Sequence, residues 1–167
     1  MKKCILYVLT AVLLLGLTAC GGEAQSTTPP ATQPTTSAAP VPPDMQSLYE
    51  TLSAQMPEMI PLDADMLLNF CGIQAEDCTQ VCAAISADGL RTDEIWLIEA
   101  ADEAALERIT ALAENRLQIK GEESITYSPE QYAVVEKAQI ITDGMYFALI
   151  VSPDADDLAE LFRGAIG

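Results

Sequence analysis

The sequence contains no histidine. Without an imidazole there is no Ser–His–Asp or Cys–His catalytic arrangement and no zinc site of the kinds that include histidine. The chain also has no phosphate-binding glycine-rich loop and no nucleophile elbow. We therefore predict that the protein is not an enzyme, and we expect no catalytic residue, no cofactor and no bound metal.

Positive charge is also scarce, because 8 Lys and Arg residues face 25 Asp and Glu residues and leave a formal net charge of −17. A chain this acidic lacks the basic surface that contacts a phosphate backbone, so we expect no nucleic-acid partner. We attribute the acidity to solubility in an ion-rich envelope. Binding of a cation or a basic ligand is the alternative.

The N-terminus begins with two positive residues, Lys2 and Lys3, and continues with an uncharged apolar segment at residues 5–17. Spanning a bilayer takes about 20 apolar residues, so this segment is short for a membrane helix. A positive start followed by a short apolar core is typical of an export signal peptide.

Leu17, Thr18 and Ala19 close the apolar segment directly before Cys20. This order resembles the bacterial lipobox, in which a branched apolar residue and two small residues precede a cysteine. The resemblance implies that the Cys20 thiol accepts a diacylglyceryl group and that cleavage occurs between Ala19 and Cys20. A thiolate is a suitable nucleophile for this step, and two acyl chains anchor a protein stably. The alternatives are an uncleaved membrane anchor and an ordinary secretory signal with an incidental cysteine.

Three parts follow from this interpretation: a lipoprotein signal peptide at 1–19, the lipidated cysteine with a disordered Pro/Thr/Ser tether at 20–43, and a single α+β domain at 44–167. Residues 21–43 contain one charge and no aromatic residue, so they cannot bury enough surface to become ordered. We expect the domain to lie outside the cytoplasm, held to the cell membrane through the lipid on Cys20.

The spacing of apolar residues predicts two amphipathic helices at the start of the domain. The first helix follows Asp44 and ends by Pro57, and Asp63 caps a second, short helix that Gly72 ends in the left-handed conformation.

Two similar units of strand, strand and helix follow these helices. The first is a hairpin at 80–100 and a long helix that closes at Lys120 and Gly121. The second is a hairpin at 138–152, with Asp143 and Gly144 as its turn, and a helix from about Asp154. Between the units, residues 128–131 have the pattern of a capping box and predict a short helix.

These units predict a four-stranded antiparallel sheet, built from two ββα units with helices on one face and preceded by the two N-terminal helices. The inner strands, at 95–98 and 145–151, are apolar on both sides. The opposite face therefore has to be covered by the two N-terminal helices or by a second protein.

The acidic residues offer two candidate sites. The densest group lies at residues 154–160 and comprises Asp154, Asp156, Asp157 and Glu160. It lacks the glycine and the terminal glutamate of a calcium loop, and acids favour the start of a helix, so we interpret it as a helix N-terminus. Asp93 and Glu94 are adjacent, so on a strand they point to opposite faces and cannot act on one substrate.

Tyrosines and cysteines are the other candidates. Tyr127 and Tyr132 flank the predicted capping box, and we expect them to pack, with a ligand surface as the alternative. Of the domain's three cysteines, only Cys71 and Cys78 are placed to form a disulfide, because Cys78 and Cys82 lie too far apart along one strand. Small buried thiols are the expectation that we prefer.

The domain also resembles a family of extracytoplasmic lipoproteins from Gram-positive anaerobes that is known only as a domain of unknown function. The resemblance extends over most of residues 58–163. It is carried by four segments, at 69–73 (NFCGI), 93–99 (DEIWLIE), 127–132 (YSPEQY) and 143–146 (DGMY). It implies an exported lipoprotein and brings no activity to any residue.

Three functions remain open. We favour a non-enzymatic lipoprotein that binds an envelope protein, or a second copy of itself, through a sheet face or a helix groove. The second is a lipoprotein that binds a small ligand or a cation for a transporter. The third is an enzyme that uses carboxylates or tyrosines, drawn from Asp93, Glu99, Tyr127 and Asp154.

Replacement of the Cys20 thiol by a hydroxyl, in Cys20→Ser, tests the anchor. Without the thiol no thioether to the lipid forms, so we expect the variant to lose palmitate labelling and to leave the membrane pellet. Cys82→Ser is the matched control and should keep both properties. A Cys20→Ser variant that stays in the pellet to the wild-type extent contradicts the anchor.

Overall fold

The computed structural model describes residues 42–167. Ala19, Cys20 and the tether up to residue 41 lie outside the described residues, so the lipid anchor stays a prediction. Among the helices of residues 42–167, none has the length and apolar character needed to cross a membrane.

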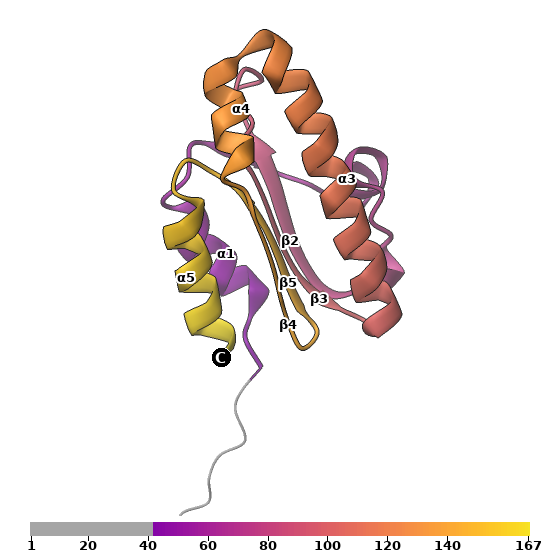
Figure 1. Cartoon of the computed structure of the whole chain (residues 1–167). Helices are drawn as coiled ribbons and strands as arrows, with labels where there is room; N and C mark the ends of the chain where they lie inside the picture. The colour runs from indigo at the N-terminus through magenta and orange to yellow at the C-terminus, as the bar shows by residue number, and fades with distance from the viewer. Residues whose placement is uncertain (1–41) are drawn as a thin grey trace, which may run out of the picture. The chain divides into compact units, whose positions relative to one another are not determined.

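The centre of the domain is an antiparallel sheet with the strand order β1-β2-β3-β5-β4 (Figure 1). The strands are β1 (Met59–Pro61), β2 (Cys78–Ser86), β3 (Glu94–Ala100), β4 (Gln139–Asp143) and β5 (Tyr146–Val151). The predicted α+β class is confirmed, but the predicted count of four strands is wrong. The missed strand, β1, has three residues and ends in a proline, so it shows no alternating pattern. Proline is tolerated there because β1 lies at the sheet edge.

Helices cover both faces of the sheet, and the prediction of helices on one face is wrong. α3 (Glu103–Tyr127) lies on one face and continues into α4 (Pro129–Glu136), while α1 (Met45–Ser53) and α5 (Ala155–Ile166) share the other (Figure 1). The final helices of the two ββα units therefore pack on opposite faces. Strand periodicity indicated that both faces are buried, but it does not specify which helix covers which face.

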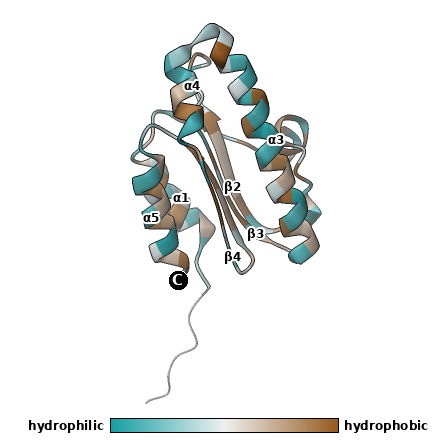
Figure 2. Cartoon of the chain, viewed as in Figure 1, coloured by the Kyte–Doolittle hydropathy of each residue, from teal (hydrophilic) through white to brown (hydrophobic). Residues whose placement is uncertain are grey.

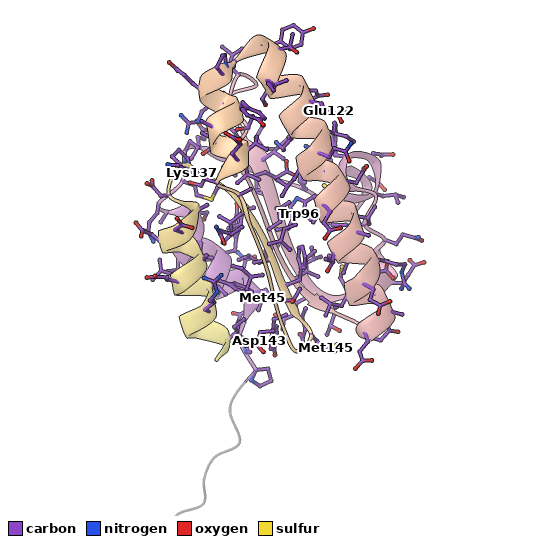
Figure 3. All side chains as sticks on the ribbon, viewed as in Figure 1. Met45, Trp96, Glu122, Lys137, Asp143 and Met145 are labelled. Carbon is purple, nitrogen blue, oxygen red and sulfur yellow. The ribbon has the colours of Figure 1, made fainter. Side chains whose placement is uncertain are left out.

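The two faces are separated by the alternation of side chains along the inner strands. On β3, Trp96 and Ile98 pack under α3, whereas Ile95 and Leu97 pack under α1 and α5. Trp96 lies on the α3 side and Met45 of α1 on the opposite side (Figure 3). The helices carry both hydrophobic and hydrophilic residues (Figure 2), and the buried residues of α3 and α5 are those that pack against the sheet. The inner strands are apolar on both sides because each side supplies a separate core.

The predicted cap at Asp63 is confirmed, and Asp44 also caps the helix that it precedes. The Asp44 carboxylate accepts a hydrogen bond from the Gln46 N–H at 3.1 Å, and that of Asp63 accepts one from the Met66 N–H at 2.8 Å. Asp63 begins α2 (Ala64–Met66), which continues as a π-helical turn, η1 (Leu67–Cys71), and a short 3₁₀ turn, η2 (Ala75–Asp77), follows. Gly72 ends η1 with a φ of 75°, as predicted.

The predicted end of the long helix is wrong, because α3 continues through Lys120 and Gly121 to Tyr127. Gly121 faces α4, where a Cβ would lie 3.8 Å from the Tyr132 ring. The glycine thus lies within α3 and not at a helix end, and a Cβ there would make an ordinary van der Waals contact. The second hairpin differs from prediction by one residue: Asp143 pairs with Tyr146, so its two-residue turn consists of Gly144 and Met145.

The backbone of Gly72 provides a test of this packing. At a φ of 75° a side chain is strained, and a Cβ would lie 3.0 Å from the Leu112 Cδ2 of α3. We expect Gly72→Ala to lower the free energy of unfolding by about 1–2 kcal/mol in urea denaturation. Gly164→Ala, at an open position within α5, should instead raise it by up to about 1 kcal/mol. Equal effects of the two substitutions would contradict the assigned conformation.

Candidate functional site

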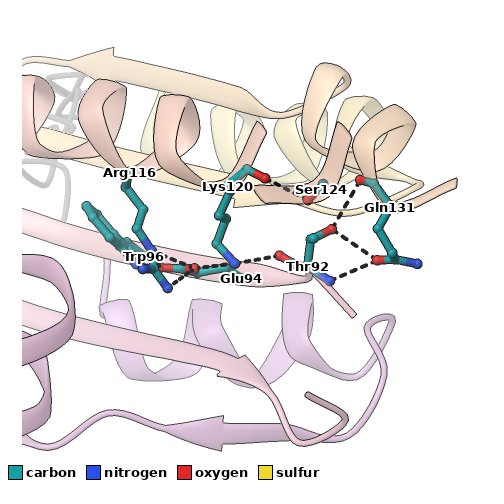
Figure 4. A network of polar contacts seen from close by, with 7 residues as sticks. All are labelled: Thr92, Glu94, Trp96, Arg116, Lys120, Ser124 and Gln131. Carbon is teal, nitrogen blue, oxygen red and sulfur yellow. Dashed lines mark hydrogen bonds and ion pairs between the residues drawn. The ribbon is translucent and has the colours of Figure 1, made fainter. Parts of the chain in front are cut away.

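A fully buried carboxylate lies where β3 begins. Glu94 has an exposed fraction of 0 % and is surrounded by hydrogen-bond donors from its own strand and from α3 (Figure 4). Its Oε1 accepts from the Trp96 indole N–H at 2.7 Å, and both of its oxygens accept from the Arg116 Nε at 3.1 Å. The Arg116 Nη2 lies 3.0 Å and the Lys120 Nζ 2.8 Å from Oε2. One carboxylate therefore pairs with two cations, which come from successive turns of α3.

A buried carboxylate is strongly unfavourable without a partner, and one well-placed cation is enough to balance it. The second cation leaves this group of three residues, Glu94, Arg116 and Lys120, with a surplus positive charge. The side chains of Arg116 and Lys120 are 23 % and 11 % exposed, so the surplus charge lies just below the surface.

Further hydrogen bonds join this group to α4. The Lys120 Nζ donates to the Thr92 carbonyl at 3.0 Å, and the Thr92 N–H and hydroxyl both donate to the Gln131 Oε1, at 2.8 and 3.1 Å (Figure 4). The predicted capping box is therefore only half formed. The Ser128 hydroxyl accepts from the Gln131 N–H at 3.4 Å, but the Gln131 side chain bonds to Thr92 and not to the Ser128 N–H. The Ser128 N–H is occupied because it donates to the Ser124 carbonyl of α3.

A cleft of about 550 Å³ opens beside this network, between the β2–β3 loop and the ends of α3 and α4. Arg116 and Lys120 line its inner part. Two large side chains, Leu90 and Tyr127, also line it while being 85 % and 87 % exposed, so they form an apolar rim. The volume falls in the range of about 300–1,000 Å³ that is typical of small-molecule sites.

Charge is unevenly distributed around the cleft. Six of the chain's eight Lys and Arg residues lie in the described part, and three of these six line the cleft. Arg91, the third, forms an ion pair with Asp93, with Nε and Oδ2 2.9 Å apart. The acids Asp88 and Glu123 are exposed at the rim and, within residues 42–167, form no ion pair. The cleft therefore presents positive charge inside and negative charge at its mouth.

The acidic residues singled out from the sequence do not form one site. Asp93 and Glu94 have different partners, as their adjacent positions predicted. Asp93 and Tyr127 line the same cleft, whereas Glu99 accepts a hydrogen bond from Gln80 of β2 and Asp154 precedes α5.

The acids at residues 154–160 begin α5, as predicted from helix electrostatics. Within residues 42–167, no three Cys, Asp or Glu residues are grouped so that they could hold a metal ion. Tyr132 was a candidate ligand residue together with Tyr127, but it lines a separate, smaller groove between α3 and α4.

The three cysteines of the domain are free thiols, so the considered disulfide between Cys71 and Cys78 is not formed. Burial, together with the nearby charge of Glu94, raises the pKa of the Cys71 thiol to about 12. Burial also raises the pKa of Cys78 to about 11. These thiols are therefore poor nucleophiles at neutral pH.

Sequence reasoning missed Arg116 and Lys120, although a signal was present. The buried side of α3 includes Ala105, Ile109 and Ala113, and the same spacing of three and four residues continues to Arg116 and Lys120. The chain has only 8 Lys and Arg residues, and two of them continue the buried side of one helix. Cations at such positions indicate a buried acidic partner.

Comparison with family models gives one match over the central part of the chain. Residues 53–152 match the family described as "Domain of unknown function (DUF4358)". The matched residues include the whole sheet and the whole cleft, whereas α5 lies outside them and α1 contributes only its last residue. Comparison with curated proteins and with solved structures gives no match.

The double ion pair can be tested by neutralising its shared carboxylate. Glu94→Gln leaves two partly buried cations without a counter-charge, and we expect it to lower the free energy of unfolding by about 3–5 kcal/mol. Glu99→Gln, on the same strand, is the control and should cost below about 1 kcal/mol, because Glu99 has a single hydrogen bond within the described residues. Similar losses in the free energy of unfolding for both variants, measured by urea denaturation, would show that the charge of Glu94 does not stabilise the fold.

Proposed function

The chain belongs to the DUF4358 family, and because that description names no activity, we propose a function from the chain's own residues. The protein is a lipid-anchored, extracytoplasmic binding protein that does no chemistry and takes a small ligand in the cleft beside Glu94.

The anchor rests on the N-terminal sequence. Leu17, Thr18, Ala19 and Cys20 have the lipobox order, and they follow an apolar segment of signal-peptide length. The likeness to Gram-positive lipoproteins supports the same location. A lipidated Cys20 with a tether at 21–43 would hold the domain at the outer face of the cell membrane and leave the cleft accessible.

The cleft is the observation that carries the binding function. Within residues 42–167 helices cover both faces of the sheet, so the sheet face considered as a partner surface is occupied by the chain's own helices. The cleft instead combines a suitable volume, an exposed apolar rim and charged groups within it. These features favour a small ligand over a protein partner.

The contacts of the carboxylates favour binding over catalysis. Asp93 is engaged by Arg91, and both oxygens of Glu94 accept hydrogen bonds from cationic groups. A general acid or base needs an oxygen within hydrogen-bond reach of a substrate, and these oxygens are already in use.

Retention of a small molecule by the intact protein tests the proposal. The lipidated protein is incubated with the fraction below about 1 kDa of a bacterial extract, washed, and examined by native mass spectrometry. We expect a bound mass on the wild type and at least a tenfold lower occupancy on the double variant Leu90→Ala/Tyr127→Ala, which removes the apolar rim.

Leu161→Ala is the control, because Leu161 is an exposed apolar residue on α5, outside the cleft. It should retain the ligand at the wild-type level. Absence of any bound mass on the wild type, or equal occupancy in all three proteins, contradicts the cleft as the binding site.

A further inference from the structure

The charges of the cleft specify the class of its ligand, an inference that rests on the proposed function. We infer that the ligand is a small zwitterion with an apolar body, such as a short peptide. Its carboxylate binds Arg116 and Lys120, and its ammonium group lies near Asp88 and Glu123.

Arg116 and Lys120 retain unused donors. Arg116 donates to Glu94 through Nε and Nη2, and its Nη1 makes no hydrogen bond within residues 42–167. The Lys120 ammonium has three N–H bonds and uses two, for Glu94 and the Thr92 carbonyl. Both side chains line the cleft and share one counter-ion. A ligand carboxylate would take up the surplus charge through charge-assisted hydrogen bonds.

The negative charge at the mouth of the cleft disfavours a ligand that is only an anion. Asp88 and Glu123 are exposed at the mouth of the cleft, and the whole chain carries a formal net charge of −17. A phosphate or a dicarboxylate would be repelled on approach, whereas a molecule without net charge is not. A positive group on the same ligand would in addition be attracted to the rim acids.

The apolar rim indicates what joins the two charges. Leu90 and Tyr127 are large, almost fully exposed side chains at the same opening, so a ligand that covers them gains hydrophobic contact. A cleft of about 550 Å³ is large enough for a ligand longer than a single small amino acid. A dipeptide with two apolar side chains meets these requirements.

Calorimetric titration of the full lipidated protein in detergent tests the inference with three probes. They are leucyl-leucine, its C-terminal amide, which lacks the carboxylate, and N-acetyl-leucyl-leucine, which lacks the ammonium group. We expect leucyl-leucine to bind at least tenfold more tightly than either modified form, because each modification removes one charge-assisted contact.

Substitutions at each end locate the two contacts. Lys120→Met should weaken the binding of leucyl-leucine at least tenfold without weakening that of the amide, and Arg116 still neutralises Glu94 in this variant. Glu123 is exposed, and Glu123→Gln should weaken the binding of leucyl-leucine without weakening that of the N-acetyl form. Lys137→Met, outside the cleft, is the control and should change neither.

The outcomes separate this inference from the function on which it rests. Equal affinity for the three probes, or tighter binding of the N-acetyl form, overturns the zwitterion and leaves a cleft that binds small molecules. No heat with any probe also overturns it. The native mass measurement with the rim variants decides independently whether the cleft binds a ligand at all.

Discussion

Two cations of α3 neutralise one carboxylate that has no contact with water, and much of the domain is positioned by this arrangement. Glu94 begins β3, so its bonds to Arg116 and Lys120 fix the second half of α3 over the end of the sheet. Lys120 also bonds to the Thr92 carbonyl, and Thr92 bonds to Gln131 of α4. The loop, the helix pair and the strand are thereby held around one cleft. Because one cation would suffice for the charge balance, the second leaves a surplus positive charge beside the cleft.

The sequence allowed much of the fold to be predicted, since most of its signals are local. The cap at Asp63, the left-handed Gly72 and the apolar inner strands each follow from short-range sterics, hydrogen bonding or burial. The predictions that were wrong concern features that depend on tertiary contacts or on very short segments. Gly121 indicated a helix end, but α3 continues through it to Tyr127 and packs against α4. Three residues of β1 carry too little periodicity to be recognised.

The candidate site was harder to predict than the fold because its parts are distant in sequence. Glu94 and Lys120 are separated by a strand and most of a helix, and only the register of α3 on β3 brings them together. Glu94 was considered together with its neighbour Asp93, although adjacent side chains on a strand point to opposite faces of the sheet. Tyr127 was identified, but as a packing residue, since its exposure follows from the extra turns of α3 that the sequence did not indicate.

Arg116 and Lys120 thus have two roles in the domain, since they neutralise the buried Glu94 and also line the cleft. The most direct test is a ¹H–¹⁵N NMR titration of the protein with the small-molecule fraction that it retains. We expect chemical-shift changes only at the Arg116 side-chain Nε–H and at backbone amides of residues 85–93 and 116–131. Shifts centred on α1 and α5, or none in the cleft, would contradict this expectation.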